Sequence, residues 1–234
     1  MIALKNVTVK AGSFTLHDVS FTVPRGAFAA VVGAAGSGKT TLLEAVAGVR
    51  ELSRGSIAIG NITVTNWPPE QRGVGLAYQH GALFPHKSVA ENIGWSSRDN
   101  KTITPIVDRL GIASLFATPI SALSGGERQL VALARALVRV SACLKAGQPA
   151  ILLLDEPFSA LDPRRRIATR EIVHTFHREW ELTTLQVTHD GAEARRSDFA
   201  VLLDGGLVVQ SGAPMDLLAS PAREDVALFL TVAT

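Results

Sequence analysis

Residues 27–48 read AFAAVVGAAGSGKTTLLEAVAG, and this stretch decides the fold. It begins with an apolar run at residues 27–32, which is typical of a parallel strand buried on both faces. Residues 33–40 (GAAGSGKT) match the pattern G-x-x-x-x-G-K-(S/T) at every fixed position. Apolar residues then recur at helical spacing as far as Gly48, where the helix is expected to stop. Strand, glycine-rich loop and helix in this order are the context in which the pattern binds phosphate.

The glycine-rich loop therefore predicts a nucleotide phosphate site. Glycines let backbone N–H groups turn toward an anion, and the helix N-terminus adds the positive end of its dipole. We expect Lys39 to reach the β- and γ-phosphates and the Thr40 hydroxyl to bind Mg²⁺. A glycine- and alanine-rich turn could match the pattern by accident, but the flanking strand and helix argue against that alternative.

The composition is that of a globular chain of 234 residues, with 47% hydrophobic residues and a net charge of +2. Nucleic-acid-binding proteins usually carry a concentrated basic face, so the small net charge argues against such a partner. No run approaches the roughly 18 apolar residues of a membrane-spanning helix. Lys5 and Asn6 interrupt any signal-peptide pattern, and Cys143 has no second cysteine for a disulfide or a zinc site. We expect a cytosolic protein with some apolar surface for a partner.

Alternating segments predict a β layer before the phosphate loop and hairpins after it. Residues 2–9 alternate apolar and polar side chains, and residues 14–23 form a second strand after a turn at Gly12. The other predicted strands are 56–59 and 62–64, which flank a two-residue turn, then 74–78, 151–154, 183–188, and the hairpin pair 199–203 and 207–210.

Short helices are predicted at residues 89–95 and 106–116, and a longer one opens at residues 123–129 (LSGGERQ). Ser124 and Glu127 have the spacing of a capping box. Two glycines in the first turn of this amphipathic helix make a second N-terminus suited to an anion.

A further helix is predicted to begin at Asp162, which has the chemistry of an N-cap and is followed by a proline. Its two histidines, His174 and His177, indicate a solvated face, because no third ligand is spaced to form a metal site with them. The helix is expected to bury Ile167, Val173, Phe176 and Trp180.

Polar side chains follow three of the predicted strands. Asp155 and Glu156 come after the apolar run 151–154, His189 follows residues 183–188, and Gln79 follows residues 74–78. Ligands of open α/β sheets bind at the carboxyl ends of the strands, so the Asp155–Glu156 pair is a candidate for a site. The chain thus combines two helix starts suited to phosphate with a strand-end carboxylate pair and a strand-end histidine.

In this order the motifs resemble those of the ATP-binding subunits of ABC transporters, over nearly the whole chain. The resemblance implies an α/β P-loop NTPase (ABC ATPase) fold with a mixed central sheet and an N-terminal antiparallel β layer. It also implies a single nucleotide-binding domain over residues 1–234, with a small helical subdomain at about residues 80–145. The corresponding motifs are Walker A at 33–40, the Q-loop at Gln79, the signature at 123–129, Walker B at 151–156, the D-loop at 159–162 and the switch histidine at His189.

The resemblance implies an ATPase that uses ATP and Mg²⁺. Glu156 would orient or activate the attacking water, His189 would hydrogen-bond the γ-phosphate, and Gln79 would touch Mg²⁺ or the water. The metal contacts would come from Thr40, Gln79 and Asp155, since a hard cation prefers oxygen ligands. The residues expected to bind the nucleotide are Gly33, Ala34, Ala35, Gly36, Ser37, Gly38, Lys39, Thr40, Thr41, Ser124, Gly125, Gly126 and Asp162.

The resemblance also implies the partners. In the family the signature contacts the γ-phosphate bound to the other subunit, so we expect a head-to-tail, ATP-dependent homodimer. A transmembrane permease would be contacted through about residues 80–95, where Phe84, Val89, Ile93 and Trp95 offer apolar surface. An external solute-binding protein would act indirectly. The chain would be a peripheral subunit at the cytoplasmic face of the inner (cell) membrane, with no nucleic-acid partner.

Three departures from the family pattern lead to further expectations. The aromatic residue that usually stacks on adenine would fall on Lys10 or Ala11, with Phe14 beyond the turn, so the stacking platform is missing. Residues 140–147 look like an insertion that lengthens the signature helix. The chain stops at Thr234, so we expect no C-terminal regulatory domain.

The cargo is also inferred by resemblance. Residues 68–75 (PPEQRGVG) and 82–93 (ALFPHKSVAENI) look closest to molybdate/tungstate-type uptake ATPases. Importers of sulfate, a polyamine or another small solute are the alternative. A soluble ABC ATPase acting on DNA or ribosomes is a further alternative, but such proteins usually carry two cassettes or a long coiled-coil insertion.

Overall fold

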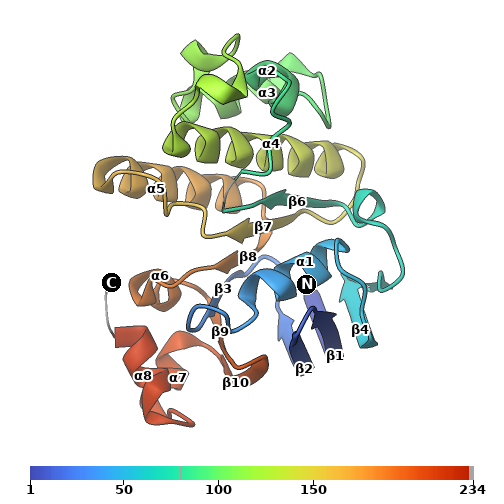
Figure 1. Cartoon of the computed structure of the whole chain (residues 1–234), viewed down its shortest axis with the longest axis vertical. Helices are drawn as coiled ribbons and strands as arrows, with labels where there is room; N and C mark the ends of the chain where they lie inside the picture. Colours follow the sequence, from blue (N-terminus) through green and yellow to red (C-terminus); the bar gives the residue numbers. More distant parts are fainter. Residues whose placement is uncertain (80, 232–234) are drawn as a thin grey trace. The chain divides into compact units, whose positions relative to one another are not determined.

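The computed structural model describes residues 1–79 and 81–231. The chain divides into two compact units, one formed by Met1–Arg72 with Leu182–Thr234 and the other by Gly73–Glu181 (Figure 1). In the described part of the chain, no helix has the length and apolar character needed to cross a bilayer.

The first unit contains the predicted antiparallel layer, in the strand order β2-β1-β4-β5. The register of β1 shifts between Leu4 and Val7, and Asn6 there has a φ of +49°. This bulge explains why the buried apolar positions skip from Leu4 to Val7. The strands are β1 (Ile2–Ala11), β2 (Phe14–Val23), β4 (Arg54–Ile59) and β5 (Ile62–Thr63).

The same unit holds a mixed set of strands in the order β10-β9-β3-β8, which confirms the predicted mixed sheet. β3 pairs in parallel with both β8 and β9, while β9 and β10 form an antiparallel hairpin. Every residue of β3 is buried, as its apolar sequence predicts. The strands are β3 (Phe28–Val32), β8 (Thr183–Val187), β9 (Phe199–Asp204) and β10 (Leu207–Gly212).

Helices flank these strands. α1 (Lys39–Ala47) contacts β1 and β8, and it ends at Gly48 as predicted. α6 (Gly191–Arg195), α7 (Pro214–Ala219) and α8 (Glu224–Thr231) share a core with side chains of β3 and β9. A short 3₁₀ turn, η1, covers Pro69–Gln71.

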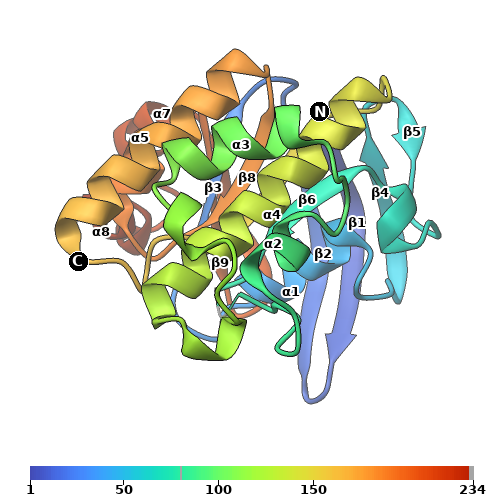
Figure 2. The same ribbon diagram turned by 90° about the horizontal axis from the view of Figure 1, so that it is seen from above.

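In the second unit a long helix lies between a strand pair and two short helices (Figures 1 and 2). α4 (Gly125–Lys145) contacts β6 (Val74–Ala77), which runs parallel to β7 (Ile151–Asp155). Residues 130–134 of α4 are all buried, because α2 (Val89–Ile93) and α3 (Asn100–Arg109) cover it as well. The remaining elements are η2 (Ala113–Leu115), η3 (Ile120–Ala122) and α5 (Pro163–Glu179).

The helix predicted at residues 106–116 is wrong in its bounds. α3 begins at Asn100 and ends at Arg109, so it includes Pro105 in its interior. Proline removes one helical hydrogen bond and usually ends a helix, which is why the segment before it was not predicted as helical. Asp99 starts the helix instead, since its Oδ1 accepts a hydrogen bond from the Lys101 N–H at 3.0 Å.

Two predictions for α5 are also wrong. Ile167 is 63% exposed, whereas Val173 and Phe176 are buried and Trp180 is half-buried. His177 is only 7% exposed, so it does not belong to a solvated face. The described residues nevertheless contain no group of three or more histidine, cysteine, aspartate or glutamate side chains that could hold a metal ion.

Candidate functional site

The phosphate loop connects β3 to α1 and depends on two glycines. Gly33 has a φ of +154°, and a Cβ there would lie 2.0 Å from the carbonyl oxygen of Leu203. Gly38 has a φ of +101°, and a Cβ there would lie 2.6 Å from the ring of Phe14. A side chain at either position would collide with its neighbours, so this close-packed loop requires glycine.

The loop gathers hydrogen-bond donors. The Lys39 ammonium donates to the carbonyl oxygens of Gly33 at 2.8 Å and Ala34 at 2.9 Å, which holds it across the loop. The Ser37 hydroxyl is buried without a hydrogen-bond partner among the described residues. The first turn of α1 carries no acidic side chain. A buried hydroxyl without a partner is costly, and a helix N-terminus attracts anions, so this set of groups fits a phosphate.

Neighbouring strands brace the loop. The Gly206 N–H, in the turn between β9 and β10, donates to the Ser37 carbonyl oxygen at 3.2 Å. The half-buried ring of Phe14 packs beside Gly38 at the start of β2. Ala11 pairs with Phe14 across the turn between β1 and β2 and is itself half-buried. The aromatic residue nearest to the predicted stacking position therefore supports the loop.

His189 emerges from the same sheet edge as the phosphate loop. β8 runs parallel to β3 with Val187 opposite Val31, and the Thr188 N–H donates to the Val31 carbonyl oxygen at 3.1 Å. The exposed His189 follows directly. The Thr188 hydroxyl donates to a Glu193 carboxylate oxygen at 2.6 Å, which fixes the turn that carries His189.

In the second unit, the structure brings Gln79 and Glu156 together. The Gln79 Nε2 donates to Oε2 of Glu156 at 3.2 Å. Asp155 is the last residue of β7 and is 3% exposed. Within this unit the Gln79 amide and the Asp155 carboxylate offer oxygen atoms, which are the ligands that Mg²⁺ prefers. The Thr40 hydroxyl of the first unit offers the same donor chemistry.

The signature residues begin α4 as predicted, and their capping box is present. The Ser124 hydroxyl accepts from the Glu127 N–H at 3.3 Å, and the Glu127 carboxylate accepts from the Ser124 N–H at 2.8 Å. Hydrogen bonds from the Ser124 hydroxyl and N–H lower the pKa of Glu127. Ser124 and Gly125 are exposed and Gly126 is half-buried, so the helix start faces solvent.

Asp162 is the N-cap of α5, as predicted. Its Oδ1 accepts hydrogen bonds from the backbone N–H groups of Arg164 at 3.1 Å and Arg165 at 3.0 Å. Its second oxygen lies 3.8 Å from the Arg165 guanidinium. Nucleotide binding by Asp162 remains a prediction beside this capping role.

Sequence reasoning missed two buried polar residues near these elements. Gln129 is 3% exposed and contacts the backbone of Glu156. Arg72 is 4% exposed, and its guanidinium donates to the carbonyl oxygens of Ala45 and Val46 at the end of α1. The sequence placed Gln129 at the end of the signature stretch 123–129, but it gave no signal for the contact with Glu156.

Comparison with known protein families identifies the chain. A family model described as ABC transporter matches residues 16–159. The chain belongs to the ABC transporter family. The ABC ATPase form of the P-loop fold, with its mixed sheet and its antiparallel sheet, is thereby confirmed.

Relatives of this ABC protein include import ATPases for different cargoes. It is 39% identical over 239 residues to the sulfate/thiosulfate import ATP-binding protein CysA of Mycobacterium tuberculosis, covering 98% of this chain and 66% of that protein. It is 36% identical over 239 residues to the maltose/maltodextrin import ATP-binding protein MalK of Escherichia coli, covering 98% and 62%. The chain thus spans less than two thirds of the length of these relatives.

A solved structure supports the same assignment. The ATP-binding cassette MJ0796, in a dimeric post-hydrolysis state bound to ADP and Pi, superposes with a TM-score of 0.79 at 26% identity. The match covers 91% of this chain and 98% of the solved chain. Residue 80, the first of the predicted permease-contacting segment, lies outside the described residues, whereas residues 81–95 are described.

Proposed function

We propose that the chain is the ATP-hydrolysing motor subunit of an ABC importer, acting with a separate membrane permease. The observation that carries the proposal is the phosphate loop, where Lys39 and the buried Ser37 hydroxyl face a glycine-rich turn. The Gln79–Glu156 pair and the solvent-facing signature helix support it. The import ATPases among the relatives support the transport role.

In this proposal the loop binds the nucleotide phosphates and Glu156 acts on water. Lys39 and the loop N–H groups neutralise the β- and γ-phosphates. Glu156, hydrogen-bonded by Gln79, orients the attacking water and accepts its proton, and His189 donates a hydrogen bond to the γ-phosphate. Thr40, Gln79 and Asp155 would hold Mg²⁺, which would neutralise charge that develops on the phosphate oxygens.

The signature supplies the second half of each site. Ser124, Gly125 and Gly126 bind the γ-phosphate held by the partner, so ATP joins two copies head to tail. The solved dimeric cassette bound to ADP and Pi supports this arrangement. The subunit is peripheral, at the cytoplasmic face of the cell membrane, because its permease lies there.

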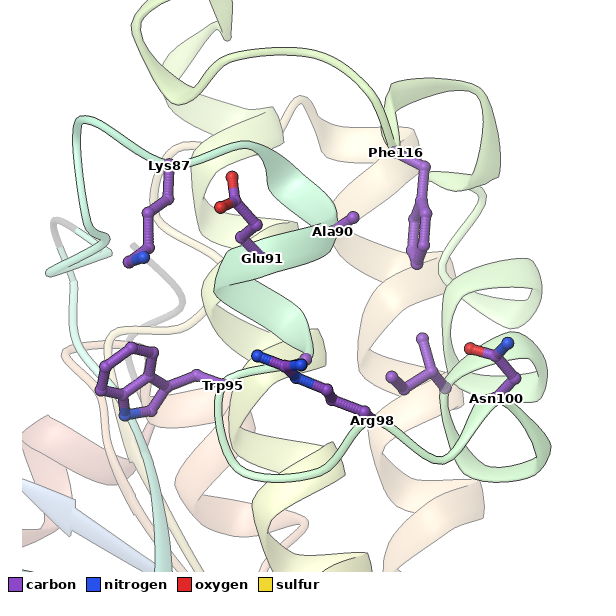
Figure 3. Close-up of a pocket in the computed structure, with 9 residues that line it drawn as sticks. Lys87, Ala90, Glu91, Trp95, Arg98, Asn100 and Phe116 are labelled. Carbon is purple, nitrogen blue, oxygen red and sulfur yellow. The ribbon is translucent and has the colours of Figure 1, made fainter.

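We place the permease contact at a cleft of the second unit (Figure 3). The cleft encloses about 400 Å³, with Lys87 and Trp95 on one side, Phe116 and Asn100 on the other, and Arg98 between them. Trp95 is 63% exposed, and the centroid of its ring lies 4.6 Å from that of the Phe84 ring. The remaining lining residues are Ala90, Glu91, Gly94 and Ile103.

The predicted permease-contacting segment exposes fewer apolar side chains than the sequence analysis predicted. Val89 and Ile93 are fully buried beside α4, so the expectation that they face the permease is wrong. Exposed aromatic surface remains at Trp95 and, half-buried, at Phe84. A cleft with an exposed aromatic anchor fits a helix of the permease laid into it.

Assembly with the permease tests whether this cleft is the contact site. Trp95→Ala and Phe84→Ala should weaken co-purification with the permease about tenfold or more, as loss of a buried aromatic anchor does at interfaces. ATP binding should be unchanged. Trp67→Ala, which removes a 39% exposed tryptophan from the other unit, is the matched control. Equal effects of Trp95→Ala and Trp67→Ala on assembly would remove the cleft from the proposal.

For the cargo we propose a tetrahedral oxyanion, molybdate or tungstate first. The sulfate/thiosulfate relative supports an oxyanion, while the maltose relative makes the experiment necessary. The complex is reconstituted in liposomes, and ATP hydrolysis is measured with the solute-binding protein loaded in turn with molybdate, tungstate, sulfate, a polyamine or maltose. Stimulation by molybdate or tungstate supports the proposal. Stimulation by a polyamine or maltose alone refutes the cargo and leaves the motor role standing.

A further inference from the structure

Gln129 is a buried amide whose polar atoms all bind one loop. The side chain is 3% exposed in the second turn of α4. Its Nε2 donates to the Glu156 carbonyl oxygen at 2.8 Å and lies 3.3 Å from the Ser159 hydroxyl. Its Oε1 accepts from the Ala160 N–H at 3.0 Å. A buried amide so fully bonded rigidifies whatever backbone it holds.

The loop that Gln129 contacts, residues 156–160, contains an unusual backbone conformation. Glu156 has a φ of +43°, in the left-handed region that non-glycine residues rarely adopt. Such a conformation persists only where its surroundings hold it. The Glu156 carbonyl oxygen accepts from Gln129 and also from the Ser159 hydroxyl at 3.1 Å. The left-handed turn is therefore fixed at its carbonyl group.

The same loop packs against the start of the signature helix. A Cβ at Gly126 would lie 3.0 Å from the Ala160 carbonyl oxygen and 3.4 Å from the Leu161 side chain. The backbone of α4 thus approaches residues 156–161 from a second point, one turn before Gln129. The helix start and the loop are tied at both positions.

We propose that Gln129 is a positioning residue that holds Glu156 in its left-handed turn, so that the Glu156 carboxylate faces Gln79. The catalytic part of this inference rests on the proposed function. In that function the signature serves the partner's nucleotide and Glu156 serves the chain's own nucleotide. Gln129 therefore links, within one chain, the parts that belong to two different ATP sites.

The test uses the full chain with two substitutions. Gln129→Leu removes the three contacts, and Gln129→Glu keeps an acceptor for Ala160 but sets an oxygen against the Glu156 carbonyl. Without nucleotide, the Ala160 amide should exchange hydrogen about tenfold or more faster in Gln129→Leu, because its acceptor is lost. With ATP, kcat should fall about 10- to 100-fold in both variants, since misplacing a reacting group by an ångström has effects of this size. The Kd for ATP should stay within about twofold, because the hydrogen-bond partners of Gln129 are Glu156, Ser159 and Ala160, and binding and turnover can change independently.

Val138→Ala is the matched control, since Val138 is fully buried on the same helix and far along it from the loop. It should lower thermal stability while Ala160 exchange and kcat stay near wild type. The proposal would be overturned if the Ala160 amide of Gln129→Leu exchanged hydrogen at the wild-type rate. It would also be overturned if both Gln129 variants kept the wild-type kcat. If the wild type hydrolyses no ATP, the motor function fails, and the exchange at Ala160 alone decides whether Gln129 holds the loop.

Discussion

At the scale of single residues, Phe14 and Ala11 carry the prediction that the nucleotide base has no aromatic ring to stack on. Phe14 packs beside Gly38 and supports the phosphate loop. Ala11, opposite Phe14 at the end of β1, offers no ring for stacking. Base–aromatic stacking contributes about 1–3 kcal/mol. A site without it should therefore distinguish poorly between ATP and GTP.

Ala11→Tyr should tighten ATP binding by about tenfold, which corresponds to ~1.4 kcal/mol of stacking. The measurement is the Kd for ATP and for GTP in wild type and variant, with Ala11→Leu as a control for added apolar surface. A wild type that already prefers ATP strongly, with no change in Ala11→Tyr, would mean that another group stacks on adenine.

Arg72 is the second residue whose role is testable by itself. Its guanidinium donates to carbonyl oxygens of Thr65, Trp67, Ala45 and Val46, at distances of 2.8 to 3.1 Å. It thereby ties the C-terminal end of the phosphate-loop helix to the segment before β6. Lysine cannot replace this planar fork of donors.

Arg72→Met should destabilise the fold by about 2–4 kcal/mol, because buried carbonyl groups lose charge-assisted partners. Thermal unfolding measures the effect, and Arg54→Met, at an exposed position of β4, is the control. Arg72→Lys should recover only part of the loss. Full recovery by lysine would mean that charge alone, and not the geometry of the fork, stabilises the helix end.

At the scale of elements, the capping box of α4 predicts a pH dependence. The folded-state pKa of Glu127 is lowered by the Ser124 hydroxyl and N–H. A carboxylate with a lowered pKa stabilises the fold above its unfolded pKa, and this contribution is lost as the pH falls through the folded pKa.

Wild type should therefore exceed Glu127→Gln in melting temperature at pH 7, and the difference should shrink as the pH falls below about 4.3, the ordinary pKa of glutamate. Glutamine keeps the acceptor but not the charge. A difference that stays constant between pH 7 and pH 3 would show that the Glu127 charge does not stabilise this helix start.

Elements with a strong local pattern were predictable from sequence. β2 has the predicted bounds of 14–23, and the turns at Gly60 and Gly205 follow from their glycines. The bounds of α3 were not predictable, because Pro105 in its interior argues against a helix. The Asp99 cap and the packing on α4 nevertheless stabilise this helix. Periodicity also could not tell that Ile167 is exposed and His177 buried, since both depend on neighbours distant in sequence.

The candidate site was predictable to a similar degree. The phosphate loop, the strand-end residues and the Ser124–Glu127 box are local patterns, and the structure has the loop, the strands and the box as predicted. The Gln79–Glu156 contact and the hydrogen bond from Gln129 to the Glu156 carbonyl oxygen join residues far apart in sequence. The left-handed φ of Glu156 has no sequence signal, because glutamate rarely adopts it.

At the scale of the whole molecule, the proposed motor requires two copies. Each chain carries a phosphate loop and a signature helix start, and the proposal assigns these to two different nucleotides. Hydrolysis should therefore depend on dimer formation, and blocking hydrolysis should stabilise the ATP-bound dimer.

The most direct test of this account is ATP turnover and oligomeric state of Glu156→Gln beside wild type. The variant keeps the phosphate loop and the shape of residue 156 but loses the carboxylate that acts on water. We expect unchanged ATP affinity, a turnover at least about 100-fold lower, and a dimer that persists with ATP and Mg²⁺ in size-exclusion chromatography. Full-rate hydrolysis by Glu156→Gln, or by a wild type that remains strictly monomeric, would contradict the account.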